Sequence, residues 1–83
     1  MTLDILTPEG KVFSDTVYGV QMPGVTGSFE VLDKHAPLIA ALSKGVLKIL
    51  KDKQTESSYE IQEGFAEVLN NKVTVLVEGA KEL

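Results

Sequence analysis

Residues 64–77 read Gly-Phe-Ala-Glu-Val-Leu-Asn-Asn-Lys-Val-Thr-Val-Leu-Val, two apolar runs separated by a pair of asparagines. Asn70 and Asn71 tolerate the left-handed backbone conformation that a tight hairpin needs. After this pair, Val73, Val75 and Val77 recur at every second position, the period at which the side chains of a strand alternate between the faces of a sheet. The stretch therefore predicts a β-hairpin whose second strand turns its valines inward.

The remainder of the chain also alternates short apolar runs with turn residues. Thr7–Gly10 places proline second and glycine fourth, as a type I turn prefers, and Pro23-Gly24 fits a type II turn. The polar stretch 52–58 predicts a mobile loop. Strands are expected at residues 3–6, 12–20, 28–32, 46–51 and 59–62. Because the turn signals recur about every 8–12 residues, the pattern predicts an all-β sandwich or barrel.

One segment, residues 35–42, allows two interpretations. Ala36, Ala40 and Ala41 are good helix formers, and Pro37 is tolerated in a first helical turn. The segment is nevertheless too short to form a stable helix by its own pattern. We therefore interpret it as a strand.

Composition excludes several function classes. The 83 residues are enough for one domain, residues 1–83, with a small core. The net charge is −4 and every cation is a lysine, so no arginine fork is present for phosphate or guanine, and we expect no nucleic-acid partner. Without cysteine there is no disulfide or thiolate metal site. The longest stretch without a charge, residues 16–29, contains proline and glycines and is unsuited to crossing a bilayer, so we expect a soluble protein.

No assembled catalytic or cofactor set is evident. His35 is the only histidine, and we interpret it as a structural or interface residue that fixes a loop. Gly24–Ser28 resembles a phosphate cradle only faintly, since the Gly-Lys-Ser/Thr ending is missing, and turn glycines explain it better. The glutamates between residues 56 and 67 are most simply a solvated face. We therefore expect no enzyme, no cofactor and no bound metal.

Apolar residues are crowded between positions 22 and 42, more densely than a small core requires. They are Met22, Val25, Phe29, Val31, Leu32, Leu38, Ile39 and Leu42. All of them could be core, or some could form an exposed patch for a partner. Composition alone leaves these two interpretations equally open.

Several ordered pieces of the chain resemble the amino-terminal domain of the ATP synthase epsilon subunit, called delta in mitochondria. The pieces are Leu3–Glu9, Pro23-Gly24, Gly27–Leu32, His35–Leu38, Lys44–Val46, Gly64–Val68 and Asn71–Leu76. Together they cover nearly the whole chain. The resemblance implies a flattened β-sandwich or barrel of about ten short strands, in which residues 35–42 are extended.

The resemblance also implies a function and two partners. Members of this family are non-catalytic rotor parts of the central stalk of F-type ATP synthase. They link the gamma subunit to the c ring and couple proton transport to ATP synthesis. The complex would hold the chain at the cytoplasmic side of the inner (plasma) membrane, as a peripheral protein. The expected contacts with gamma are His35, Ala36, Leu38, Ala40 and Leu42, and those with the c ring are Thr26, Ser28, Phe29 and Glu30.

The chain departs from the family pattern at several positions. Ser28 stands where many bacterial members have a glutamate that contacts the c ring, and the nearest acid is Glu30. Asp33-Lys34 replaces a common Pro-Gly before the histidine, and Glu63 replaces the first glycine of a Gly-Gly pair. The family's carboxy-terminal helical hairpin has no counterpart before Leu83. Because Ser28 replaces the glutamate of other members, the resemblance implies different chemistry at the c-ring contact.

Two other function classes remain open from the residues. Lipoyl and biotinyl carrier domains are also acidic, all-β and about as long, and they carry a modified lysine at a hairpin tip. Asp33-Lys34 resembles the lipoyl acceptor dipeptide, which makes Lys34 the candidate for modification. A generic sandwich adaptor without either partner is the third possibility.

Overall fold

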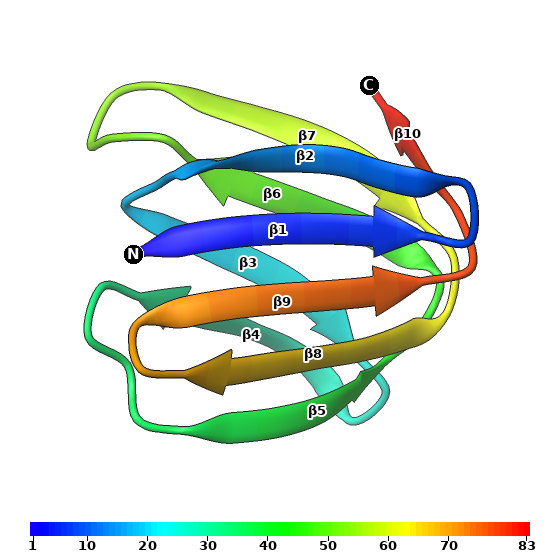
Figure 1. Ribbon diagram of the computed structural model, residues 1–83, viewed down its shortest axis with the longest axis horizontal. Coiled ribbons are helices and arrows are strands. Elements are labelled where there is room, and N and C mark those ends of the chain that lie inside the picture. The colour runs from blue at the N-terminus through cyan, green and yellow to red at the C-terminus, as the bar shows by residue number, and fades with distance from the viewer.

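The computed structural model describes residues 1–83 as strands joined by short connections (Figure 1). The ten strands are β1 (Thr2–Thr7), β2 (Gly10–Thr16), β3 (Gly19–Gly24), β4 (Gly27–Leu32), β5 (Leu38–Leu42), β6 (Gly45–Leu50), β7 (Glu56–Ile61), β8 (Gly64–Leu69), β9 (Lys72–Val77) and β10 (Ala80–Glu82). The expected all-β fold of about ten strands is confirmed. No helix is long and apolar enough to cross a membrane.

The strands form two facing layers (Figure 1). One layer has the order β10-β7-β6-β3-β4, and the other has the order β5-β8-β9-β1-β2. The layers are joined where β3 pairs with β5, through the single residue pair Gly24–Leu42. Strands β1 and β9 run parallel, whereas the other pairs are antiparallel. The result is a sandwich whose sheet nearly closes into a barrel.

The space between the layers is filled only by apolar side chains. Seventeen buried hydrophobic residues form one cluster, and no polar or charged residue is buried. Val73, Val75 and Val77 of β9 belong to this cluster, as the alternation predicts. Phe13 of β2 and Tyr59 of β7, which belong to different layers, stack edge to face with 6.2 Å between ring centroids. The core thus fixes both layers against each other.

Local turn chemistry explains both the confirmed and the incorrect element boundaries. Asn70 and Asn71 have φ of 52° and 60°, the left-handed pair expected for the β8–β9 hairpin. The turn expected at Pro23-Gly24 is wrong, because both residues lie in β3 and pair with β4. The turn falls at residues 25–26, followed by Gly27 with φ of 128°. Gly24 is needed for close approach instead, since a Cβ there would lie 2.7 Å from the Gly27 carbonyl oxygen.

Three other boundaries differ from expectation. The single strand expected over residues 12–20 is two strands, because the N–H groups of Val17 and Tyr18 leave the β1–β2 ladder and donate to Met1 and Leu50. The strand expected over residues 35–42 is extended, but it begins only at Leu38, after Pro37. The loop expected over residues 52–58 ends earlier, since β7 begins at Glu56 and pairs with β6.

Candidate partner-binding surface

A groove runs between the β3–β4 hairpin and β5, at the side of the sandwich where these strands form the edge. Its volume is about 620 Å³, and it is lined by residues 24–30, by His35 and by residues 38–41. The groove exists because β3 and β5 pair only at Gly24–Leu42, so residues 38–40 of β5 are paired with no strand on that side. One end is held closed by the Val25 N–H, which donates to the Ala41 carbonyl at 3.0 Å.

The structure brings most of the expected contact residues together in this groove. Residues expected to contact the c ring form one wall, namely Thr26, Ser28, Phe29 and Glu30. Residues expected to contact gamma form the other, namely His35, Leu38 and Ala40. Ala36 is exposed next to His35 but lies outside the lining. Leu42 is 2% exposed and packs in the core, so it has no side-chain surface to offer a partner.

The crowded apolar stretch is divided between core and surface. Met22, Val31 and Leu42 are buried, whereas Val25 is 62% and Ile39 is 74% exposed. Phe29 and Leu38 are partly buried and pack against the core from the groove. The stretch is therefore divided between core residues and exposed apolar side chains, and a partner at the exposed ones stays a prediction.

Polar side chains give the groove two fixed features. The side-chain amide of Gln21 donates to the carboxylate of Glu30 at 2.8 Å, which holds that acid on the outer face of β4. The ring Nδ1 of His35 lies 2.7 Å from the carbonyl oxygen of Ala36, so it donates to that oxygen. His35 thus forms this bond within its own loop, and its structural or interface role stays a prediction.

An apolar row on the outer face of the other layer was not among the expected site residues. Across four strands, Ala41 of β5 pairs with Phe65 of β8, Phe65 with Leu76 of β9, and Leu76 with Leu6 of β1. Phe65 is 60% and Leu76 is 52% exposed. The signal was present in the sequence, because both residues alternate with the inward-facing alanine and valines of their strands.

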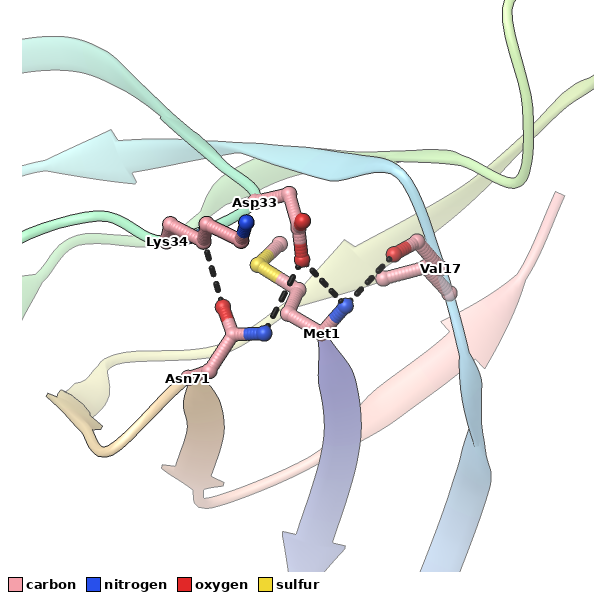
Figure 2. A network of polar contacts seen from close by, with 5 residues as sticks. All are labelled: Met1, Val17, Asp33, Lys34 and Asn71. Carbon is pink, nitrogen blue, oxygen red and sulfur yellow. Dashed lines mark hydrogen bonds and ion pairs between the residues drawn. The ribbon is translucent and has the colours of Figure 1, made fainter.

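A polar cluster fixes the link between β4 and β5 (Figure 2), and this link lies at the opposite end of the sandwich from the β3–β4 turn (Figure 1). The Asp33 carboxylate accepts from the Met1 α-ammonium group at 2.7 Å and from the Asn71 side-chain amide at 3.0 Å. These bonds, the first above all, lower the pKa of Asp33 below its usual value. The side-chain oxygen Oδ1 of Asn71 accepts from the Lys34 N–H at 2.7 Å.

No group of three or more His, Cys, Asp or Glu side chains has an arrangement that could hold a metal ion. Asp4 has its pKa lowered mainly by a hydrogen bond from Ser14, but its other neighbours are Lys11 and Lys72. The salient surface features are therefore an apolar groove and an apolar row.

Sequence and structure comparisons agree with this architecture. Residues 1–83 match the family described as ATP synthase, Delta/Epsilon chain, beta-sandwich domain. The chain belongs to this family. An ATP synthase epsilon chain of Chlorobaculum tepidum is 43% identical over 77 residues, which cover 93% of this chain and 88% of that relative.

Two solved structures share the epsilon-type fold. A chain of the Euglena gracilis mitochondrial ATP synthase (OSCP, F1 and c-ring) superimposes with a TM-score of 0.90 at 21% identity, over 96% of this chain and 51% of that one. A chain of the Tetrahymena thermophila mitochondrial ATP synthase (central stalk and c-ring) gives 0.82 at 19% identity, over 96% and 64%. At these identities the likeness shows the fold.

Proposed function

We propose that this chain is a non-catalytic rotor subunit in the central stalk of an F-type ATP synthase. It links the gamma subunit to the c ring and so couples proton transport to ATP synthesis. The family match over residues 1–83 carries the proposal. The two mitochondrial chains of the same fold come from assemblies of F1 or the central stalk with the c-ring. Through the c ring the chain is a peripheral protein on the cytoplasmic side of the inner (plasma) membrane.

The surface suits a protein that two partners hold. Gamma contacts the wall of the groove formed by His35, Leu38 and Ala40, together with neighbouring Ala36, and the c ring contacts the β3–β4 turn from Thr26 to Glu30. Because both walls belong to one groove, the two partners meet along it. A standard interface covers about 800 Å² of each partner, so two of them occupy a large part of the 4941 Å² surface.

The sandwich is suited to transmitting torque. Its layers are held by a continuous apolar core without buried polar groups, and protein interiors pack about as densely as organic crystals. A domain of this kind deforms little when partners exert force on two of its surfaces, so it rotates as a unit. The role needs stiffness and grip and no catalytic side chain.

Assembly of variants tests the gamma contact. Ile39→Asp places a charge on the most exposed apolar side chain of the groove, while the matched control Val46→Asp alters a 53% exposed valine of β6. We expect Ile39→Asp to lose co-purification with gamma and ATP-driven proton pumping, and Val46→Asp to keep both. Equal behaviour of the two folded variants contradicts this placement, and failure of the unmodified chain to bind gamma or the c ring contradicts the function.

A charge reversal tests the c-ring contact. Glu30 and Glu60 are both exposed acids in strands of the same layer. Glu30→Lys should reduce retention on c-ring-containing membranes, whereas Glu60→Lys should leave it unchanged. Equal retention of both variants contradicts a contact at Glu30.

No observation favours the carrier hypothesis. Lys34 does not lie at a hairpin tip, because β4 and β5 on either side of it belong to different layers. Its backbone has φ of 65°, and its N–H is held by Asn71. The structure gives this lysine a place in a fixed link, and the family match covers that link.

A further inference from the structure

The side chain of Asn71 joins two segments that lie far apart in the chain (Figure 2). Asn71 is the second residue of the β8–β9 turn, and its side-chain oxygen Oδ1 accepts from the Lys34 N–H at 2.7 Å. Its Nδ2 donates to the Asp33 carboxylate at 3.0 Å. Lys34 and Asp33 belong to the β4–β5 link, residues 33–37. Both ends of one amide group therefore hold neighbouring residues of this link.

The β8–β9 turn itself does not require these two bonds. It needs a left-handed backbone at both asparagines, and Asn70 and Asn71 have φ of 52° and 60°. Glycine would adopt this conformation equally well. Of the two side chains, that of Asn71 bonds to the link. The turn therefore explains the backbone at position 71, and the link explains the asparagine side chain.

The link depends on this contact at Lys34. The backbone of Lys34 has φ of 65°, which is unfavourable for a residue with a β-carbon unless its surroundings support it. The N–H groups of Asp33 and His35 donate to backbone carbonyl groups. The N–H of Lys34, which lies between them, donates to the Asn71 side chain. Asn71 thus supports the left-handed residue of the link.

The conformation of Lys34 decides how the next residues are presented. His35 and Ala36 follow directly and are exposed, and Pro37 then leads into β5. The ring of His35 bonds only to the neighbouring Ala36 carbonyl, so this bond moves with the link. A different φ at Lys34 changes the direction of both exposed side chains, because the backbone dihedral angles are the soft degrees of freedom of the chain.

We propose that Asn71 is a positioning residue for the partner surface: its side-chain amide holds the left-handed backbone of Lys34 and so directs His35 and Ala36 toward gamma. Asn71 lies outside the lining of the groove and acts through the link, without a contact of its own to gamma. The effect on gamma binding rests on the function proposed above, whereas the effect on the link does not.

The first test compares Asn71→Gly with Asn70→Gly in the 83-residue chain. Glycine keeps the left-handed backbone at either position, but only the first change removes the two bonds to the link. We expect Asn71→Gly to shift the NMR signals of the Lys34 and His35 amides and to speed hydrogen exchange at Lys34 by roughly 10-fold. Asn70→Gly should leave these signals and this exchange rate unchanged. Equal signals and exchange in the two variants overturn the proposal.

Asn71→Asp adds a measurement that a general loss of stability would not change. The new carboxylate still offers an oxygen to the Lys34 N–H, but it faces Asp33 in place of the amide donor. The other charged groups at Asp33 are the Met1 nitrogen and the Lys34 side chain. We expect the Lys34 signal to differ from that of the unmodified chain at neutral pH and to approach it in acid, as one of the two carboxyl groups takes up a proton. A difference that does not change with pH overturns the proposal.

Binding to gamma provides the second arm, measured at a temperature at which both glycine variants are fully folded. We expect Asn71→Gly to bind gamma about 3- to 10-fold more weakly, since the released link must be ordered again on association. Asn70→Gly should bind like the unmodified chain. Equal binding by the two variants, with the Lys34 signal shifted in only one of them, overturns the positioning of the partner surface. If the unmodified chain does not bind gamma, the proposed function fails, whereas the Lys34 signal still decides whether Asn71 holds the link.

Discussion

Gly64, the first residue of β8, leaves no room for a side chain. A Cβ at this position would lie 2.0 Å from the Leu76 carbonyl oxygen and 2.7 Å from the Val77 Cα, both backbone atoms of β9. Backbone in a paired strand moves only at the expense of its hydrogen bonds. The close approach lets β8 pair with β9 while it also pairs with Leu42 of β5.

We therefore expect Gly64→Ala to lower the free energy of unfolding by about 3 kcal/mol. The measurement is the urea midpoint at an unchanged slope. Gly79→Ala is the matched control, because its Cβ would meet only the flexible side chain of Gln62, and we expect a change within about 0.5 kcal/mol. Equal midpoints for the two variants would show that the close approach of β8 and β9 at Gly64 does not exclude a side chain there.

The ionisation of Asp33 makes the stability of the fold depend on pH. Its pKa is lowered in the folded chain, chiefly by the hydrogen bonds from the Met1 terminus and Asn71. A lowered pKa stabilises the folded state above the ordinary value of 3.8, and this contribution disappears as the pH falls through the folded value. We expect Asp33→Asn to be less stable than the unmodified chain near neutral pH and the difference to shrink in acid. Denaturant midpoints across this range provide the measurement, and a constant difference contradicts the assignment.

Among the strands, the β8–β9 hairpin was predictable from the sequence, whereas the pairing of distant strands was not. The hairpin is indicated by residues close together in the sequence, namely Asn70, Asn71 and the alternating valines. The parallel β1–β9 pair and the single β3–β5 contact join segments far apart in the chain. Such contacts depend on the packing of distant segments, which a local sequence pattern does not indicate. For the same reason the turn predicted at Pro23-Gly24 was misplaced.

Asn70 provides the test of the hairpin. Its φ of 52° is accessible to glycine and asparagine. For alanine, which has a β-carbon but no side-chain amide, this backbone conformation is unfavourable. We expect Asn70→Ala to lower the free energy of unfolding by about 1 kcal/mol and Asn70→Gly to leave it nearly unchanged. Equal losses in the two variants would point to the asparagine side chain instead of the backbone conformation.

In the whole molecule, most of the residues expected to contact partners line one groove, which no pattern in the sequence predicted. The two expected contact sets were assigned to different sides, yet they line the same hollow. Leu42 could not be distinguished from its neighbours without knowing which face of β5 turns inward, and it lies in the core. Phe65 and Leu76 become a continuous row only when β8 and β9 are placed in register.

The proposed function requires that gamma holds this domain along the groove beside β5. The most direct measurement places a photo-crosslinking residue at position 39 or at position 46 and irradiates the assembled synthase. Both positions are exposed, but they lie in different layers of the sandwich. We expect a covalent adduct with gamma from position 39 and none from position 46. An adduct from position 46 alone, or none from position 39 in an intact complex, contradicts it.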